Sequence, residues 1–509
     1  MQVWSEMART LRTANRFLPE ICQYGCLQSQ RRQSASTTVE HAPDTVKPLS
    51  EMPEIKLSVF DIAKILVKDE MKHNHEQQLQ IAHEYGPIYR QKFGNSFDAV
   101  FVMDAMAAEQ LVRQLGQETS RLNVPQWEEY RTLRGEDAGI LLSQDEEWRR
   151  IRRVMDKPML RMTHMERYTQ ELNPVMKDFV DHIAAARRDD GSVDNLNHNF
   201  FNWALESIAL LLYRRRFGCI DGSSDALSKK FTESVSTMFE LNMKMFGLPP
   251  KFIRIFFPLM WKKFVDCWDT FFIMGRRCVE ETKTLQDEGI LSSILAQNQL
   301  TEMQVVSSLT ETMMAAVDTT SNTVLWILYE LARHRDIQEK LLKELNDVIP
   351  PGQQPTYEHI KQTHYLKAIV RESLRIHPAV ISINRRLSHD TVILGYQVPA
   401  GMHVMLFGYG MSLSGEVFDN PKEFRPERWL RQNRTSSLAS FASMPFGIGA
   451  RGCLGRRVAE LEMYLVLSQL IRRFDVVLTD PEPLKGLSRI LVVPEKQIPV
   501  IFKDRSSSI

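Results

Sequence analysis

The chain has 509 residues, of which 43% are hydrophobic, and a formal net charge of +1 at pH 7. This content is enough for a large buried core, and the near-neutral charge gives no indication of a nucleic-acid partner. The six cysteines are scattered without a CxxC pair, which argues against a zinc site or a disulfide framework and suits a reducing compartment.

The N-terminal segment over residues 1–37 has an unusual composition. It contains five Arg, no Lys and only two Glu, with frequent Ser and Thr and with apolar residues dispersed at helix-like spacing. This Arg-rich, acid-poor composition predicts a mitochondrial transit peptide, with a disordered basic tail as the alternative. No stretch here approaches the ~20 apolar residues of a membrane-spanning helix.

The folded part of the chain is expected to be one domain over residues 59–505, because no Gly/Ser-rich or Pro-rich linker interrupts it. Residues 38–58 contain three prolines and are expected to form an extended lead-in. Within the domain, residues 88–93 and 99–103 flank a Gly-Asn-Ser turn and predict a β-hairpin.

A basic helix is predicted after Ser143, because Ser143 and Glu146 have the spacing of a capping box. Trp148 and Arg152 lie four residues apart and share a face of this helix. An indole N–H and a guanidinium together suit a carboxylate ligand. The alternative is a solvated basic face, because three further arginines surround the pair.

Residues 246–263 form an aromatic, apolar and basic segment that is interrupted by Pro249, Pro250 and Pro258. The segment cannot span a bilayer, but it can lie on one with its basic side chains among the headgroups. The alternative is an ordinary buried helix and loop. We expect peripheral contact with a membrane through this segment.

A long helix is predicted from Thr301 to about Arg335. Thr301 and Gln304 form a capping box at its start, and apolar residues continue at helical spacing over roughly 50 Å. Its middle carries a polar cluster with Asp318 and Thr319, which is costly inside an apolar helix unless it meets water, a partner or a ligand. The cluster either bends the helix or places an acid and an alcohol to deliver protons.

The helix that ends at His377 carries Glu372 and Arg375 on one face, three residues apart. Most pairs of this kind are surface salt bridges that contribute little to stability. Lys367 and Arg371 precede them on the same helix, one turn apart, and give it a basic face.

Residues 379–386 are predicted to form a strand. Strand alternation places Ile381, Ile383 and Arg385 on one face, and Arg386 takes the place of Arg385 in the alternative register. Three further short strands are expected between turns, over residues 391–394, 396–398 and 403–406.

The segment from Phe446 to Gly455 contains the most specific pattern, a cysteine between glycines in front of a long helical pattern. Unpaired N–H groups and the dipole at that helix N-terminus are expected to lower the pKa of Cys453 and to favour the metal-binding thiolate. The glycines allow close approach of a flat ligand, and Arg451 can hold an anionic group of that ligand. A buried structural cysteine is the alternative.

The same segment satisfies the GxGxxG spacing of dinucleotide-binding proteins, from Gly447 to Gly452. That motif should follow a hydrophobic strand and lead, about 20 residues later, to an acid that ends a second strand. Residues 440–445 are a poor strand, and Glu460 and Glu462 lie inside the following helix. We therefore reject dinucleotide binding.

Together, Phe446, Gly449, Arg451, Cys453 and Gly455 resemble the haem-binding loop of the cytochrome P-450 superfamily, with every signature position filled. The resemblance extends over residues 55–500. It implies a mainly α fold with a small β-rich lobe (α+β) and a long central helix over the haem. It also implies haem b as the cofactor, with an axial Cys453 thiolate that favours cleavage of the O–O bond.

The resemblance gives roles to the pairs described above. Trp148 and Arg152 are similar to the clamp that binds a haem propionate, and Arg385 is a second candidate for the propionates. Asp318 would relay protons, and Thr319 would hydrogen-bond the dioxygen substrate.

A third partner of the Glu372–Arg375 pair is also implied. Arg428 stands at the end of a Phe-x-Pro-x-Arg sequence that begins at Phe424. Glu372, Arg375 and Arg428 would form the structural triad of the family. One departure is Ala316, where the family more often has Gly.

Lys367, Arg371, Arg456 and Arg457 would form a basic surface beside Cys453, where a small acidic iron–sulfur protein docks by charge complementarity. These residues and the transit-like N-terminus resemble the mitochondrial branch of the family, which receives electrons from an adrenodoxin-type ferredoxin and its NADPH reductase. A solvated basic face is the alternative. The expected location is the matrix side of the inner mitochondrial membrane, as a peripheral protein.

Within this branch, residues 315–320, 326–333 and 341–344 look most like the vitamin D 24-hydroxylases and related invertebrate enzymes. We therefore expect a monooxygenase that uses O2 to hydroxylate an apolar sterol, steroid, secosteroid or similar lipid. The residues that would line the substrate cavity are Val380, Ile381 and Ile383. The alternatives are a haem-thiolate isomerase or lyase without external electrons and a non-enzymatic haem sensor, and the acid–alcohol pair and the basic surface argue against both.

Overall fold

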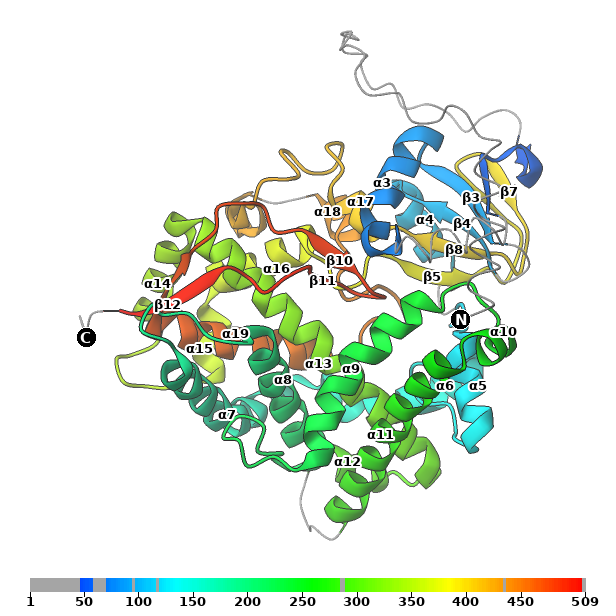
Figure 1. Ribbon diagram of the computed structural model, residues 1–509. Coiled ribbons are helices and arrows are strands. Elements are labelled where there is room, and N and C mark those ends of the chain that lie inside the picture. The colour runs from blue at the N-terminus through cyan, green and yellow to red at the C-terminus, as the bar shows by residue number, and fades with distance from the viewer. Residues whose placement is uncertain are drawn as a thin grey trace, which may run out of the picture. The chain divides into compact units, whose positions relative to one another are not determined.

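Helices make up most of the described chain, and the longest of them, α13 (Glu302–Arg333), has 32 residues (Figure 1). The computed structural model describes residues 46–57, 70–93, 97–115, 119–283, 289–433 and 436–505, and all of these belong to one compact unit that starts at Val46. The transit peptide expected over residues 1–37 lies outside the described residues.

The other α-helices of the described chain follow one another with short connections. They are α3 (Asn74–Tyr85), α4 (Ala105–Leu115), α5 (Pro125–Arg134), α6 (Asp145–Leu160), α7 (Met165–Ala186), α8 (Leu196–Tyr213), α9 (Ala226–Lys244), α10 (Pro250–Phe256), α11 (Pro258–Lys283), α12 (Ile290–Leu295), α14 (Arg335–Val348), α15 (Tyr357–Gln362), α16 (His364–Ile376), α17 (Gly408–Ser412), α18 (Ser437–Ala442) and α19 (Arg456–Arg473).

The start of α13 confirms the capping box predicted from the sequence. The Thr301 hydroxyl accepts a hydrogen bond from the Gln304 N–H at 3.1 Å, and the Gln304 side-chain oxygen accepts one from the Thr301 N–H at 3.2 Å. Apolar residues are buried along the whole of α13 because it packs against α8, α11, α16 and α19. The prediction of a mainly helical fold with a long central helix is therefore confirmed.

Strands from distant parts of the chain form the β-rich lobe. Its five-stranded sheet has the order β2 (Glu54–Leu57), β3 (Ile88–Phe93), β4 (Phe97–Val102), β8 (His403–Leu406) and β5 (Ile383–Arg386). β3 and β4 form the predicted hairpin, whereas β4 pairs in parallel with β8 from the other end of the chain. In Figure 1 these strands gather with α3 and α4 beside the helical part.

Three smaller sheets complete the strand pairing of the described chain. They are β1 (Lys47–Pro48) with β7 (Tyr396–Val398) and β6 (Thr391–Ile393), β9 (Phe474–Leu478) with β12 (Val500–Asp504), and β10 (Gly486–Ser488) with β11 (Val492–Pro494). The three short strands predicted after residue 390 are thus present as β6, β7 and β8.

Three local features differ from the sequence-based expectation. The described part of the lead-in, residues 46–57, contributes β1 and β2 to two sheets and therefore lies inside the folded unit. The strand expected over residues 379–386 begins only at Ile383. The N-cap of α6 is Gln144, because the Ser143 hydroxyl donates instead to the Gly139 carbonyl at 2.5 Å.

Glu372 is the centre of a buried charge network. Its carboxylate accepts two hydrogen bonds from the Arg375 guanidinium, at 2.8 and 3.0 Å, and one from Arg428 at 2.9 Å. The Trp429 indole N–H donates to the same carboxylate at 2.8 Å. The structure thus brings the three expected triad residues together and ties α16 to the segment that leads toward the cysteine loop.

Replacing Glu372 with Gln should destabilise the protein, because two buried guanidiniums would lose their countercharge. Breaking a buried ion pair costs about 3–5 kcal/mol, a large share of the ~5–15 kcal/mol that stabilises a typical domain. The yield of soluble protein and its melting temperature measure the effect. Lys343→Ala, which removes an exposed ion pair with Asp347, is the control and should change stability by less than about 1 kcal/mol. A melting temperature of Glu372→Gln equal to that of the control would contradict the structural role.

Candidate active site

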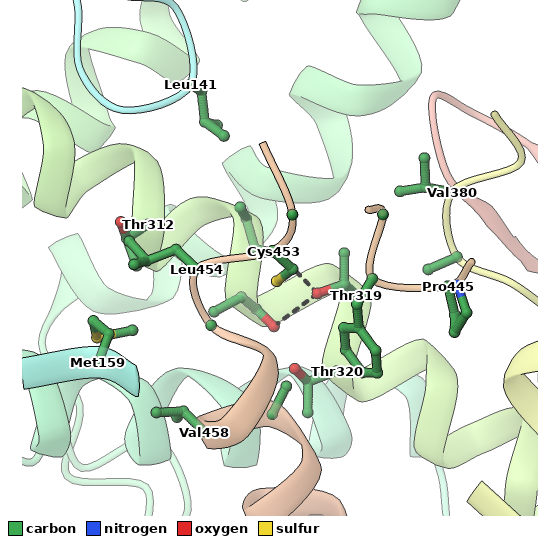
Figure 2. Close-up of a pocket in the computed structure, with 18 of the residues that line it drawn as sticks. Leu141, Met159, Thr312, Thr319, Thr320, Val380, Pro445, Cys453, Leu454 and Val458 are labelled. Carbon is green, nitrogen blue, oxygen red and sulfur yellow. Dashed lines mark hydrogen bonds between the residues drawn. The ribbon is translucent and has the colours of Figure 1, made fainter. Parts of the chain in front are cut away.

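One cavity of the described chain brings together most of the segments singled out from the sequence. It has a volume of about 1420 Å³ and lies between the middle of α13, the loop in front of α19 and residues 379–383. Figure 2 shows Thr319 and Thr320 of α13 facing the same space as Cys453 and Pro445 of the loop. The cavity therefore has the acid–alcohol helix on one side and the lone cysteine on the other.

The loop that carries Cys453 has a tight conformation. The Cys453 N–H donates to the Phe446 carbonyl at 2.8 Å, and Gly447 and Gly449 have φ angles of 67° and 72°, where glycine is unstrained. Gly455 is the N-cap of α19. Protein surrounds the loop, but the Cys453 side chain opens into the cavity and its surface is exposed there.

The expected lowering of the Cys453 pKa is wrong for the thiol as it stands in the chain. Burial raises this pKa, and the Gly455 N–H and the Arg152 charge offset only part of the increase. The helix N-terminus does not by itself make Cys453 a thiolate. A cation at the sulfur is needed to favour the charged form.

Three buried arginines, Arg121, Arg385 and Arg451, form a cluster at one edge of the cavity. Burial lowers the pKa of each guanidinium. Repulsion from Arg121 lowers the pKa of the other two further, to about 10 for Arg385 and about 8 for Arg451. This mutual effect shows that the three charges lie close to one another.

Backbone carbonyls hold the arginine cluster in place. Arg451 donates to the Ser143 carbonyl at 2.6 Å, Arg385 donates to the Ile448 carbonyl at 2.7 Å, and Arg121 donates to the Leu141 carbonyl. No carboxylate of the described residues forms an ion pair with any of the three. Like charges that are buried without a counter-ion fit a site for an anion with more than one negative charge.

Trp148 and Arg152 line the same cavity, so neither belongs to a solvated face. The Trp148 side chain is buried, and the Arg451 guanidinium lies 4.3 Å from the centre of its ring. Arg152 donates to the Gly452 carbonyl at 2.7 Å and forms an ion pair with Asp156 at 2.6 Å. The pair therefore contacts the cysteine loop from α6.

The register of β5 follows the first of the two sequence alternatives. Arg385 is 7% exposed, whereas Arg386 is exposed to solvent. Val380 and Ile383 line the cavity, but Ile381 does not. The structure therefore keeps two of the three residues expected to face a substrate.

Asp318 and Thr319 face different sides of α13. Thr319 lines the cavity, and its hydroxyl donates to the Ala315 carbonyl at 2.9 Å. Asp318 is 0% exposed and does not line the cavity; its carboxylate accepts a hydrogen bond from the Asn322 amide at 2.8 Å. Burial raises the pKa of Asp318 to about 6, against the opposing effects of the Arg489 charge and the Asn322 hydrogen bond.

Glu462 is a buried acid of the cavity wall that the sequence pattern did not single out as functional. It lies on α19 and contacts the same cavity as Cys453. Burial raises its pKa to about 8, so the carboxyl is mostly protonated at neutral pH. Arg121 was also missed, because no motif surrounds it in the sequence.

A family model described as Cytochrome P-450 matches residues 56–502. The chain belongs to the cytochrome P-450 family. Similar proteins include the mitochondrial 1,25-dihydroxyvitamin D(3) 24-hydroxylase of Mus musculus, with 32% identity over 87% of each chain. The mitochondrial sterol 26-hydroxylase of Rattus norvegicus is 33% identical over 90% of each chain. The mitochondrial cholesterol side-chain cleavage enzyme of Oncorhynchus mykiss is 31% identical, with 94% of this chain and 96% of that protein covered.

The residues around the cavity fit the haem that cytochrome P-450 monooxygenases carry. Cys453 is the cysteine of the family loop and opens into the cavity. The arginine cluster lacks an acidic partner among the described residues and would match the two negative propionates of haem. Cys453 would hold the iron, and Arg121, Arg385 and Arg451 would hold the propionates together with Trp148 and Arg152.

The basic residues expected near the cysteine lie on α16 and α19. Burial and repulsion from Arg456 both lower the pKa of Arg371, which shows that these two side chains are neighbours. Arg371 lies 4.2 Å from the centre of the Trp429 ring, and Arg456 forms an ion pair with Glu460 at 3.1 Å. Lys367 is half-buried and donates to the Lys361 carbonyl at 2.8 Å.

Arg457 has a different environment from the other basic residues of the cytochrome P-450 surface. Its guanidinium donates to the Leu160 carbonyl at the end of α6 and is only partly exposed. A depression that Cys453, Arg456 and Arg457 share lies beside the loop. Lys367, Arg371 and Arg456 therefore present the available charge, while Arg457 also connects two helices.

Proposed function

We propose that this protein is a mitochondrial monooxygenase that hydroxylates a sterol, a steroid, a secosteroid or a similar apolar lipid. The observation that carries the proposal is the cavity in which the Cys453 sulfur and the Thr319 hydroxyl face the same space (Figure 2). The names of the similar proteins, which refer to a sterol, cholesterol and a vitamin D compound, support this class of substrate.

Haem bound by a thiolate supplies the reductive activation of O2: one oxygen atom enters a C–H bond, and the other leaves as water with two protons and two electrons. The residues of this chain then have to hold an apolar substrate, exclude bulk water and supply the protons. Each task corresponds to a separate part of the cavity region.

Apolar side chains form the part of the cavity wall that a lipid would contact. Burial of an apolar surface contributes roughly 25 cal/mol per Å², so such a wall binds a lipid without specific polar contacts. The side chains of this wall are Leu141, Ile208, Ala315, Ala316, Val380 and Ile383. The methyl group of Ala316, where the family more often has Gly, narrows the wall along α13.

The position of Asp318 supports a relay of protons from the side of α13 that is remote from the cavity. Its hydrogen-bond partner Asn322 lines a second cavity of about 190 Å³, together with Arg489 and the exposed side chains of His198 and Glu233. A carboxyl with a pKa of about 6 can both bind and release a proton near neutral pH. We infer that Asp318 receives protons from this second cavity and that Thr319 presents them to the substrate side.

The basic surface of Lys367, Arg371 and Arg456 supports an acidic electron donor. A small adrenodoxin-type ferredoxin, reduced by its NADPH reductase, would dock there through complementary charge. The similar proteins whose names place them in mitochondria favour this donor. Two electrons would then arrive singly beside the cysteine loop.

Contact with the matrix side of the inner mitochondrial membrane is supported by the segment 246–263. α10 and the start of α11 expose Ile255 at 71%, Phe256 at 59% and Leu259 at 82%, next to exposed basic side chains. Such a surface fits the boundary between headgroups and acyl chains. None of the described helices combines the length and the apolar character needed to cross a bilayer.

Replacing Cys453 with Ala tests the axial ligand. The reduced, carbon monoxide-bound wild-type protein should show the red-shifted Soret band of a thiolate ligand, and Cys453→Ala should lack it. Cys267→Ala is the control, because Cys267 is buried in α11 away from the cavity and its loss should leave the band in place. A wild-type spectrum without this band would exclude the haem-thiolate function.

Replacing Thr319 with Ala tests the delivery of protons. Product formed per electron consumed should fall by about tenfold or more, because a positioned proton donor typically contributes ~10²–10⁴-fold to a rate. Thr312→Ala is a matched control: Thr312 lies two turns earlier on the cavity side of α13, and its hydroxyl also donates to a helix carbonyl. Equal coupling in the two variants would contradict the role of Thr319 and would favour a haem-thiolate isomerase or lyase.

Neutralising the basic surface tests the electron donor. The double variant Lys367→Gln/Arg371→Gln should bind an acidic ferredoxin about tenfold more weakly at low salt. The difference should shrink near 0.1 M salt, where the screening length is ~10 Å. Lys229→Gln/Lys230→Gln removes the same charge from exposed positions of α9 and should bind normally. Ferredoxin titrations of both variants, each with an intact thiolate spectrum, decide the question.

A further inference from the structure

The loop of residues 139–143 (the 139–143 loop) contacts both the cavity and the arginine cluster. Ile140 and Leu141 line the cavity. The Leu141 carbonyl accepts a hydrogen bond from Arg121, and the Ser143 carbonyl accepts one from Arg451 at 2.6 Å. The position of this short loop therefore sets the position of two guanidiniums and of part of the cavity wall.

Glu311 holds the 139–143 loop from α13. One carboxylate oxygen accepts a hydrogen bond from the Gly139 N–H at 3.2 Å, and the other accepts one from the Leu141 N–H at 2.7 Å. The Arg131 guanidinium forms an ion pair with the same carboxylate at 2.6 Å. Glu311 is 0% exposed, so water does not compete for these bonds.

The fit between Glu311 and the loop is as close as the backbone permits. A Cβ atom on Gly139 would lie 2.5 Å from a Glu311 carboxylate oxygen, which is closer than such atoms approach without displacement. The Arg131 guanidinium is fixed in turn, 4.4 Å from the centre of the Trp268 ring. α5, α11, α13 and the loop therefore meet at one buried carboxylate.

We propose that Glu311 is a positioning residue of the active site. By holding two amides of the 139–143 loop, it fixes the carbonyls that orient Arg121 and Arg451. The inference rests on the proposed function, because those two arginines would bind the haem propionates. Glu311 itself touches neither the haem pocket nor the substrate wall, and it acts through the loop.

The variant Glu311→Gln tests this role because it keeps the size of the side chain. The Gln amide group loses the negative charge and presents an NH2 where a loop N–H or the Arg131 guanidinium needs an acceptor. In the haem-loaded protein, amide hydrogen exchange of a peptide that spans the 139–143 loop should accelerate about tenfold. Haem transfer to an excess of apomyoglobin should accelerate by a similar factor.

Glu206→Gln is the matched control. Glu206 on α8 is also fully buried, accepts a hydrogen bond from the Cys219 N–H at 2.7 Å and pairs with Arg216, but it does not line the cavity. It should lower the melting temperature as Glu311→Gln does, while the exchange of the 139–143 loop and the rate of haem transfer stay at wild-type values. Equal loop exchange and haem transfer in both variants would overturn the positioning role.

Gly139→Ala tests the same contact from the loop if Glu311→Gln does not fold. The added methyl group should push the loop from the carboxylate and accelerate haem transfer, whereas an unchanged rate and unchanged loop exchange would overturn the proposal. The carbon monoxide spectrum separates this outcome from a failure of the proposed function. A wild-type protein without the thiolate band would refute the function, whereas loop exchange reports on Glu311 independently of that band.

Discussion

Repulsion among the three guanidiniums of Arg121, Arg385 and Arg451 is the constraint on which the region around the cavity depends. Buried like charges without a counter-ion are unfavourable, and the lowered pKa values express this cost. Carbonyls of three separate loops hold these groups, and Glu311 holds one of the loops. A dianionic ligand relieves the repulsion, so binding of haem and stability of the native fold should be strongly coupled.

α13 separates two environments that a single-turn sequence motif describes as one. Thr319 faces the apolar cavity, while its neighbour Asp318 faces a small polar cavity with Asn322 and Arg489. Adjacent residues of a helix point about 100° apart, so an acid and an alcohol next to one another in sequence reach opposite sides of the rod. The pair is therefore suited to passing protons across the helix while the substrate side remains shielded from bulk water.

Features that depend on local spacing could be predicted from the sequence. The capping box at Thr301, the Glu372–Arg375 pair and the cysteine loop are each set by residues within a few positions. Contacts between distant segments could not be predicted in this way. The bonds from Glu311 to Gly139 and from Arg121 to Leu141 join loops that carry no motif. The Cys453 pKa was misjudged because burial, which requires the fold, outweighs the helix N-terminus.

The five-stranded sheet has a consequence for the order in which the chain becomes structured. β4, with the apolar sequence Phe-Asp-Ala-Val-Phe-Val, forms a hairpin early but finds its other neighbour, β8, only when residues 403–406 are present. Until then one edge of β4 remains unpaired, which makes aggregation a hazard for a partly assembled chain. A chain that crosses a membrane unfolded and N-terminus first would keep this edge open for most of its passage. Chaperone binding to β4 during import would therefore protect the same sheet that later borders the active site.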